Sequence, residues 1–275
     1  MTTTDRYGVM GYPVSHSRSP VIHRLFALQT NQNLQYELLQ VTPEKLSMAV
    51  RQFQRTGGKG LNITVPHKAE VIKLCDQLSE RASSAGAANT LTFRDGEIYG
   101  ENTDGIGLLR DLVINLGITL EDANILILGA GGATRGIVAP LLEMQPASLR
   151  IANRTLDKAQ VLADHFSRSG PVSACRFNMV PVSDKYDLII NATSAGVKGE
   201  APPYPAAAIS RQTLCYDLSY GLKPTPFSEW ARAQGAEKSV MGWGMLVEQA
   251  AESFHIWRGV RPETAPVLKQ MKISA

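Results

Sequence analysis

The segment GLNITVPHK, residues 60–68, places two candidates for proton transfer just after an expected β-strand. His67 is one, because an imidazole ordinarily changes its charge near neutral pH. It directly follows Pro66 at an expected helix start, where an exposed cap-region role or a backbone contact is at least as good an interpretation as catalysis. Lys68 is the other, since an ammonium group can stabilise a developing oxyanion and deliver a proton. The local pattern alone leaves both open.

Other polar side chains gather where strands of the first hundred residues are expected to end, the usual position of ligand sites in α/β proteins. Ser15 and Ser17 stand two residues apart in GYPVSHSRSP and offer two hydroxyl donors for a carboxylate. The remaining members carry amide, hydroxyl or carboxylate groups: Asn62, Thr64, Asn89, Asn102, Thr103 and Asp104. Each also has a structural interpretation as a helix cap, a turn former or a group bonded to its own backbone. Together they favour a small polyhydroxylated acid as the ligand.

The elements that would position these residues alternate between short apolar runs and amphipathic stretches, which is typical of an α/β fold with mostly parallel sheets. Strands are expected near residues 7–10, 36–41 and 60–65, followed by helices over 20–29, 43–55 and 67–74. In the third strand apolar residues alternate with Asn62 and Thr64, so this polar face is expected to turn toward the ligand. Ser19 and Thr42 are expected to cap helices that begin with proline. An Asp-Gly pair at 95–96 predicts a hairpin turn.

A second α/β pattern begins at about Asp104 and contains ILILGAGGATRG, a buried strand followed by a glycine-rich turn and a helix start. In that context the backbone N–H groups of the turn can bind a pyrophosphate at the helix N-terminus. Gly129 and Gly131 occupy the first two positions of a G-x-G-x-x-G fingerprint, whereas Thr134 stands at the third. The match is imperfect, and a purely structural turn is the alternative interpretation.

The end of the next expected strand indicates which dinucleotide would bind. An NAD site usually has an acidic residue there for the ribose 2′-hydroxyl. The residues at this point are instead Asn153, Arg154, Thr155 and Lys158. A guanidinium, a hydroxyl and an ammonium suit a 2′-phosphate, so the sequence favours NADP; a helix cap at Thr155 and a solvent-exposed Arg154 are the structural alternatives. A further strand ends in NATSAG, which would bring Thr193 and Ser194 to the cofactor.

Composition sets the wider limits. A chain of 275 residues, 44% hydrophobic and 19% charged, fits one large or two smaller globular domains. The formal net charge of +3 includes no run of like charges, so nothing indicates a nucleic acid or an anionic membrane as partner. Three cysteines without C-x-x-C spacing and five histidines without an H-x-x-x-H pair argue against disulfides and metal sites. With no apolar leader or long apolar run, a reducing cytoplasm fits best.

Eight motifs follow one another along the whole chain: VSHSRSP, NITVPHK, ENTDGIG, GAGGATRG, NRT, NATSAG, DLSY and GWGMLVEQAAESF. This series resembles the shikimate dehydrogenase family of NADP-dependent enzymes. The resemblance implies two α/β domains. Residues 1–103 and the C-terminal helices of 243–275 would form a substrate-binding domain with a mostly parallel sheet, and residues 104–242 a Rossmann-type NADP-binding domain.

The resemblance also implies roles for individual residues. Lys68 and Asp104 match the catalytic pair. Residues that hold the substrate match Ser15, Ser17, Thr64, Asn89, Tyr220 and Gln249. Cofactor positions match Gly129, Ala130, Gly131, Gly132, Ala133, Asn153, Arg154, Thr155 and Lys158, with Leu218 and Gly242 at the nicotinamide. The departures from the family pattern, Tyr12, Arg18, Leu218 and Ala250, remove no group that the chemistry needs.

The reaction implied is reversible hydride transfer between NADPH and 3-dehydroshikimate, which produces shikimate for aromatic amino acid biosynthesis. The division of proton transfer between Lys68 and Asp104 stays open. One alternative is a quinate/shikimate dehydrogenase that uses NAD, and another is a catalytically silent NADP(H)-binding regulator. The NADP-specific residues argue against the first and the catalytic pair against the second. We expect a small-molecule substrate and a monomer or homodimer.

Overall fold

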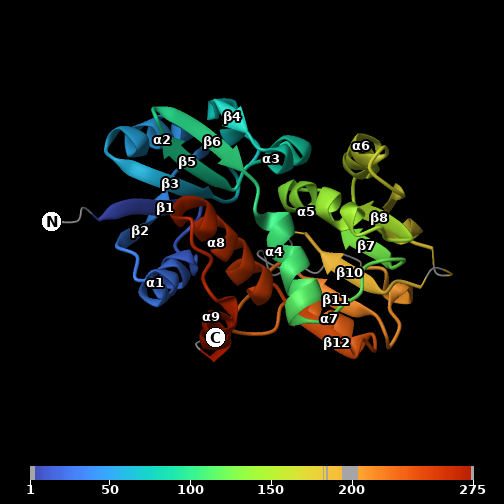
Figure 1. Cartoon of the computed structure of the whole chain (residues 1–275). Coiled ribbons are helices and arrows are strands. Elements are labelled where there is room, and N and C mark those ends of the chain that lie inside the picture. Colours follow the sequence, from blue (N-terminus) through green and yellow to red (C-terminus); the bar gives the residue numbers. More distant parts are fainter. Residues whose placement is uncertain (1–3, 182, 184, 194–203, 274–275) are drawn as a thin grey trace. The chain divides into compact units, whose positions relative to one another are not determined.

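The computed structural model describes residues 4–181, 183, 185–193 and 204–273, and the chain divides into two compact units. Unit 1 consists of Met1–Leu108 and Leu246–Gln270, and unit 2 of Leu109–Met245 and Met271–Ala275. The division falls within three helices: α4 (Asp104–Arg110), α8 (Trp243–Arg258) and α9 (Thr264–Ile273). Each unit combines a sheet with helices, as the sequence predicts (Figure 1).

Unit 1 has a sheet that, over the described residues, contains six strands in the order β2-β1-β3-β5-β6-β4. The β1-β2, β1-β3 and β4-β6 pairs are parallel, and the β3-β5 and β5-β6 pairs are antiparallel. The strands are β1 (Asp5–Gly11), β2 (Leu34–Gln40), β3 (Gly58–Ile63), β4 (Gln77–Leu78), β5 (Thr90–Arg94) and β6 (Glu97–Glu101). The helices that lie wholly in this unit are α1 (Ser19–Gln29), α2 (Leu46–Arg55) and α3 (Glu80–Ala85).

Strand β3 is covered on both faces. Its residues alternate between the faces, and Leu61 and Ile63 join the core cluster to which α2 contributes. Asn62 points to the other face, where its amide donates to Ser253 Oγ on α8. Figure 1 shows α2 on one side of this sheet and α1 and α8 on the other. The predicted alternation is therefore present, but the Asn62 side chain is buried beneath α8 rather than open to a ligand.

Some local predictions for unit 1 need correction. The residues after β3 form turns and a short 3₁₀ helix, η2 (Val71–Leu74), instead of a helix over 67–74. Ser19 is the first residue of α1 and not its cap. Thr42 precedes the 3₁₀ turn η1 (Pro43–Lys45), but its hydroxyl bonds the Glu44 carboxylate rather than a backbone N–H group. The hairpin turn is confirmed, since Asp95 and Gly96 have φ values of 54° and 83°.

Unit 2 has an all-parallel sheet whose described strands run in the order β12-β11-β10-β7-β8-β9. The strands are β7 (Asn124–Leu128), β8 (Ser148–Asn153), β9 (Val172–Arg176), β10 (Leu188–Asn191), β11 (Leu214–Asp217) and β12 (Lys238–Met241). The helices wholly within unit 2 are α5 (Gly132–Glu143), α6 (Leu156–Phe166) and α7 (Pro226–Ala233), and a π-helical turn, η3 (Asp111–Asn115), continues α4.

This strand order is that of the doubly wound Rossmann fold. From β7 the chain first builds outward through β8 and β9, then returns to the other side of β7 for β10, β11 and β12. The order therefore reverses between β7 and β10, and the carboxyl ends of these strands form the usual crevice for a dinucleotide. The four residues of β7 from Ile125 to Leu128 are fully buried, as expected for a central parallel strand.

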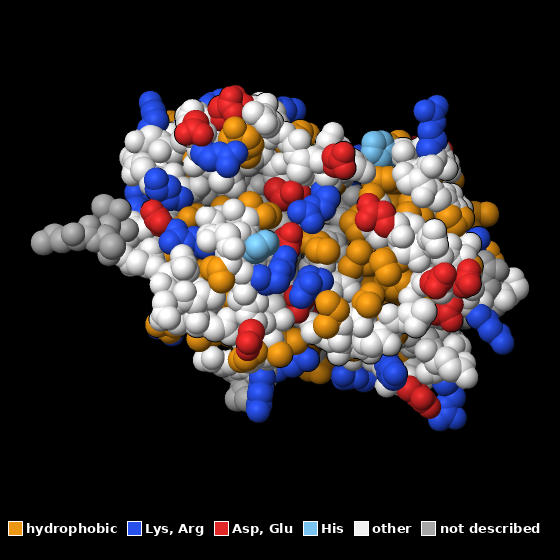
Figure 2. Space-filling model, viewed as in Figure 1, with side chains coloured by type: hydrophobic (Ala, Val, Ile, Leu, Met, Phe, Trp, Pro, Cys, Tyr) orange, Lys and Arg blue, Asp and Glu red, His pale blue; other side chains and the backbone are white. Residues whose placement is uncertain are grey.

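Two observations concern the helices and the titratable side chains in the described part of the chain. No helix there is long and apolar enough to span a bilayer, and no cluster of histidine, cysteine and acidic side chains could hold a metal ion. On the face shown in Figure 2, basic and acidic side chains are interspersed. The charge distribution on this face has no large region of one sign that would attract a polyanion.

Candidate active site

Lys68 and Asp104 come together because of the directions of three neighbouring strands. Strands β3 and β6 both run antiparallel to β5, so the segments after β3 and β6 reach the same edge of the sheet. Lys68 lies in the turn after β3, and Asp104 is the first residue of α4, after β6. Lys68 Nζ donates to Asp104 Oδ2 at 2.6 Å, and the two side chains are 19% and 7% exposed. Shielding from water strengthens the action of these charges on a bound ligand.

Asn89 and Gln249 complete this polar cluster of unit 1. Asn89 Nδ2 donates to Asp104 Oδ1 at 2.9 Å and lies 3.4 Å from Gln249 Oε1. The two carboxylate oxygens of Asp104 therefore bind different donors, the lysine ammonium and the asparagine amide. Such a pair of bonds fixes the rotation of the carboxylate, and neither Asn89 nor Asp104 is a simple turn or cap residue.

Ser15, Ser17 and Thr64 lie in loops that follow the parallel strands β1 and β3. The loops are in contact, because Tyr12 N donates to Val65 O at 3.0 Å. Ser17 Oγ donates to Ser19 Oγ at 3.2 Å, Ser15 is exposed, and Thr64 is half-buried. Within the described part of the chain none of the three is hydrogen-bonded to Lys68 or Asp104, so they form a neighbouring group of hydroxyls at the same edge of the sheet.

His67 serves a structural purpose. Its ring is buried, and Nε2 lies 2.7 Å from the backbone carbonyl of Val41. A carbonyl only accepts hydrogen bonds, so Nε2 carries a proton and donates a hydrogen bond to the Val41 carbonyl, in the loop after β2. The contact removes the imidazole from the candidates for proton transfer and leaves Lys68.

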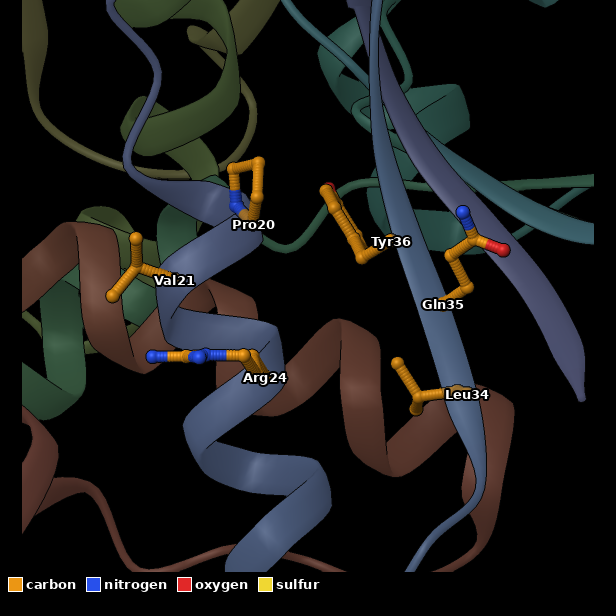
Figure 3. Close-up of a pocket in the computed structure, with 6 residues that line it drawn as sticks. All are labelled: Pro20, Val21, Arg24, Leu34, Gln35 and Tyr36. Carbon is orange, nitrogen blue, oxygen red and sulfur yellow. The ribbon is translucent and has the colours of Figure 1, made fainter.

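A surface groove of about 360 Å³ lies in unit 1 between α1 and β2. It is lined by Pro20, Val21, Arg24, Leu34, Gln35 and Tyr36 (Figure 3). Figure 3 shows Tyr36 projecting from β2 toward α1. The lining is mainly apolar and includes none of the predicted site residues, so this groove is not the candidate active site.

The glycine-rich turn of unit 2 has the geometry of a phosphate loop. Gly129 has a φ of 107°, and a side chain there would also press on the Ala192 carbonyl at 3.0 Å. Helix α5 begins at Gly132, and a Cβ atom on Gly131 or Gly132 would meet no atom within 4 Å. The backbone at the N-terminus of α5, with Ala130 and Ala133 as its neighbours, is thus open to an anion.

Thr134 explains the departure from the strict fingerprint. It is fully buried, and its hydroxyl donates to the Gly129 carbonyl at 2.9 Å. This bond closes the turn across the start of α5. In the strict fingerprint a small third residue lets the helix pack closely on the strand; here the threonine instead stabilises the turn by a hydrogen bond.

The residues expected around the adenosine phosphate follow β8. Asn153 Nδ2 donates to the Thr155 carbonyl at 2.8 Å, which orders the short link between β8 and α6. Arg154, Thr155 and Lys158 are exposed at the start of α6, and the Thr155 hydroxyl does not cap that helix. Two cationic side chains and one hydroxyl are therefore available at the carboxyl end of β8.

The loops after β10 and β11 are tied together by a buried pair that the sequence analysis did not single out. Asn191 Nδ2 donates to Asp217 Oδ1 at 3.1 Å, and Asn191 Oδ1 accepts from the backbone and the hydroxyl of Thr193. Asp217 Oδ1 also accepts from Ser219 N at 3.0 Å. Burial raises the pKa of Asp217. Two polar residues at the ends of buried strands were the available signal.

Leu218, Tyr220 and Gly242 lie near this pair, whereas Ser194 falls outside the described residues. Gly242 N donates to Ser219 O at 3.0 Å, and a Cβ atom on Gly242 would lie 2.5 Å from the Leu218 carbonyl oxygen. Only glycine allows this approach of the two backbones. The Tyr220 ring packs against Trp243 with ring centroids 4.8 Å apart.

Comparison with known proteins gives a consistent result. Family models match over three segments: the shikimate dehydrogenase substrate binding domain over residues 9–91, shikimate/quinate 5-dehydrogenase over 112–198, and the shikimate 5′-dehydrogenase C-terminal domain over 242–272. The chain is 52% identical over 273 residues to shikimate dehydrogenase (NADP(+)) of Methylococcus capsulatus, covering 99% of this chain and 98% of the relative. It is 51% identical over 269 residues to the protein of that name from Alkalilimnicola ehrlichii, covering 98% and 99%.

A solved structure agrees. Shikimate 5-dehydrogenase from Thermus thermophilus, in complex with NADP(H) and shikimate, matches with a TM-score of 0.87 at 30% identity, covering 99% of this chain and 100% of that one. The fold, the phosphate loop and these similarities lead to one conclusion: this chain belongs to the shikimate dehydrogenase family.

Proposed function

We propose that this protein is an NADP-dependent oxidoreductase that reversibly reduces 3-dehydroshikimate to shikimate in aromatic amino acid (chorismate) biosynthesis. The observation that carries the proposal is the shielded Lys68–Asp104 pair, held by Asn89, in a chain of this family. An ammonium, a carboxylate and two amides are the groups needed to bind ring hydroxyls and protonate a carbonyl oxygen.

The chain's own residues supply the proton and the orientation. When bound, NADPH supplies the hydride. As the substrate carbonyl gains negative charge on oxygen, the Lys68 ammonium stabilises that charge and donates its proton. Asp104 holds Lys68 Nζ in position and accepts a hydrogen bond from a ring hydroxyl. In the oxidation direction the lysine takes the proton back, with the pair acting as one coupled unit.

The remaining polar residues orient the substrate. The hydroxyls of Ser15, Ser17 and Tyr220 are proposed to bind its carboxylate. Each hydroxyl can donate a hydrogen bond, and an ionised carboxylate only accepts them. Thr64, Asn89 and Gln249 are proposed to bind the ring hydroxyls. Unit 1 is the proposed substrate-binding domain and unit 2 the proposed NADP-binding domain.

The cofactor residues fit NADP. The open backbone of residues 129–133 at the N-terminus of α5 would hold the pyrophosphate. Asn153, Arg154, Thr155 and Lys158 would bind the 2′-phosphate. Leu218 and Gly242 would line the nicotinamide, and Thr193 and Ser194 would face the cofactor. The absence of an acidic residue at the end of β8 supports NADP over NAD, because an acidic side chain there would repel the phosphate.

The test is an assay of the purified protein with shikimate or quinate, each with NADP or NAD. Reduction of NADP by shikimate well above the other three combinations is expected. A preference for quinate and NAD would instead identify the quinate/shikimate form, and no dinucleotide reduction in any combination would favour a silent regulator. We also propose a cytoplasmic monomer or homodimer, which light scattering coupled to gel filtration resolves.

A further inference from the structure

The Asn89 carboxamide is held in one orientation by a buried set of hydrogen bonds. The backbone N–H of Thr103 donates to Asn89 Oδ1 at 2.8 Å. A backbone N–H is only a donor, so the atom that faces it must be the amide oxygen. The Asn89 NH2 group therefore faces the opposite way, toward Asp104 Oδ1 at 2.9 Å and Thr103 Oγ1 at 2.9 Å.

A second donor to the same oxygen comes from Thr90. The Thr90 hydroxyl donates to Asn89 Oδ1 at 3.1 Å, and the Thr90 side chain is fully buried. With this bond the Asn89 oxygen accepts from two donors, Thr103 N and the Thr90 hydroxyl. Two bonds to one oxygen resist rotation of the carboxamide, whereas the loss of one of them holds it less firmly.

Thr90 is itself supported from two elements. Ser253 Oγ on α8 lies 2.7 Å from Thr90 Oγ1, and Asn62 Nδ2 on β3 donates to Thr90 Oγ1 at 3.1 Å. Asn62 in turn accepts from the Tyr36 hydroxyl at 2.7 Å. The chain of bonds thus extends from the ring of Tyr36, at the α1–β2 groove of Figure 3, through the core of unit 1 to Asp104.

We propose that Thr90 is a positioning residue for the reaction: its hydroxyl, backed by Ser253, holds the Asn89 carboxamide so that the NH2 group of Asn89 fixes the Asp104 carboxylate toward Lys68. Thr90 has no hydrogen bond to Lys68 or Asp104, so it acts through Asn89. The inference rests on the proposed function, because it assigns Thr90 a part in the same reaction.

The decisive variant is Thr90→Val, which keeps the shape of the side chain and removes only the hydroxyl. The turnover number for shikimate oxidation should fall on the order of tenfold, the effect of losing one buried hydrogen bond at the site. The KM for NADP should not change, since Thr90 belongs to unit 1 and the proposed cofactor residues belong to unit 2. Thr90→Ser restores the hydroxyl without the methyl group and should recover most of the turnover.

The matched control is Thr213→Val in unit 2. Thr213 is also fully buried, and its hydroxyl donates to the Tyr186 carbonyl at 2.8 Å. This variant loses a buried hydroxyl in the same way, so its melting temperature should fall while its turnover stays at the wild-type value. A turnover of Thr90→Val within twofold of Thr213→Val would overturn the proposal, and so would an equal loss in Thr90→Val and Thr90→Ser.

Ser253→Ala keeps the inference testable if Thr90→Val does not fold. It removes the hydroxyl that backs Thr90 and should lower turnover with an unchanged KM for NADP; wild-type turnover would then contradict the proposal. A wild-type protein without shikimate oxidation would refute the proposed function itself, which separates that failure from the failure of the role of Thr90.

Discussion

At the scale of single residues, the central feature is a lysine whose ammonium group is hydrogen-bonded to a carboxylate with little access to water. Lys68 lies in a turn and not on a helix, so its position depends on its bond to Asp104 rather than on a regular backbone. Because Asp104 positions the lysine, its own carboxylate must be held in place, and the bond from Asn89 does this. The position of the Lys68 ammonium, the proposed proton donor, is thus set by a chain of bonds that joins side chains from three separate segments.

Replacement of this lysine gives the first prediction. Lys68→Ala should lower the turnover number roughly 10²- to 10⁴-fold, the range for loss of a general acid, with much less effect on substrate binding. Steady-state kinetics with shikimate and NADP measure this. Lys73→Ala is the control, because Lys73 is a 69% exposed lysine paired with Glu70 and should retain full activity. An undiminished turnover in Lys68→Ala would remove the lysine from the mechanism.

Arg154 gives a second prediction at this scale. Arg154→Ala removes a charge-assisted bond to the 2′-phosphate, so the KM for NADP should rise roughly 10- to 100-fold while the KM for NAD stays unchanged. The ratio of the two KM values reports the change. Arg168→Ala, an exposed arginine just beyond the C-terminal end of α6, makes the same change in net charge and should leave the ratio intact. Equal effects on both dinucleotides would exclude a phosphate contact.

At the scale of elements, the loops that follow β10, β11 and β12 determine the shape of the proposed NADP site in unit 2. The Asn191–Asp217 pair joins the ends of β10 and β11, and Gly242 then lets the end of β12 approach the loop after β11. The loop that carries Leu218 and Tyr220 is therefore held from both sides. Its conformation is a property of three neighbouring strands and not of its own sequence.

Gly242→Ala tests this arrangement. A Cβ atom would lie 2.5 Å from a backbone oxygen, which cannot swing away like a side chain, so the loop after β11 must shift. Overpacking of this kind costs about 1–3 kcal/mol of folding free energy. The melting temperature should fall and the KM for NADP should rise. Gly221→Ala in the same loop, where the nearest atom to a Cβ would lie at 3.4 Å, should change neither; identical behaviour of the two variants would contradict the steric argument.

At the scale of the whole molecule, a buried histidine links the stability of the fold to pH. His23 of α1 is 1% exposed and stacks on Tyr36 with ring centroids 4.2 Å apart. Burial lowers the pKa of His23 to about 3. Between about pH 6.5, where a histidine in an unfolded chain titrates, and pH 3, the unfolded state binds a proton that the folded state does not. Stability is therefore complete above this window and falls as the pH decreases through it.

The fourth prediction follows from that sign. Melting temperatures measured from pH 7.5 to pH 4.5 should fall less steeply for His23→Phe than for the wild type, because the phenyl ring retains the stacking and cannot bind a proton. Within the window, the slopes of unfolding free energy against pH for the wild type and His23→Phe should differ by up to about 1.4 kcal/mol per pH unit. His165→Phe replaces an exposed histidine of α6 in the same way; it is the control and should keep the wild-type slope. Parallel curves for His23→Phe and wild type would refute the linkage.

Much of the fold was predictable because it rests on local patterns. Apolar alternation indicated β3, the continuous apolar run indicated β7, and the Asp-Gly pair indicated the turn between β5 and β6. The segment over 67–74 was not, since its apolar spacing suits a helix, while the His67 ring bonds the Val41 carbonyl and the Lys68 carbonyl accepts from Ala88 N. Local propensity fails where tertiary bonds hold the chain.

The sequence by itself determined which chemical groups are present, the glycine-rich loop, the cationic residues after β8 and membership of the family, because these depend on residue type and spacing. The tertiary structure decided what each polar group binds. It assigned His67 to the Val41 carbonyl, buried Asn62 beneath α8 and joined Thr90 to Ser253 across 163 positions of the chain. Such bonds form only when distant elements pack against one sheet. Once buried, these polar groups have no water to bond, so they must pair with one another, and this selects one arrangement among the many that the sequence allows.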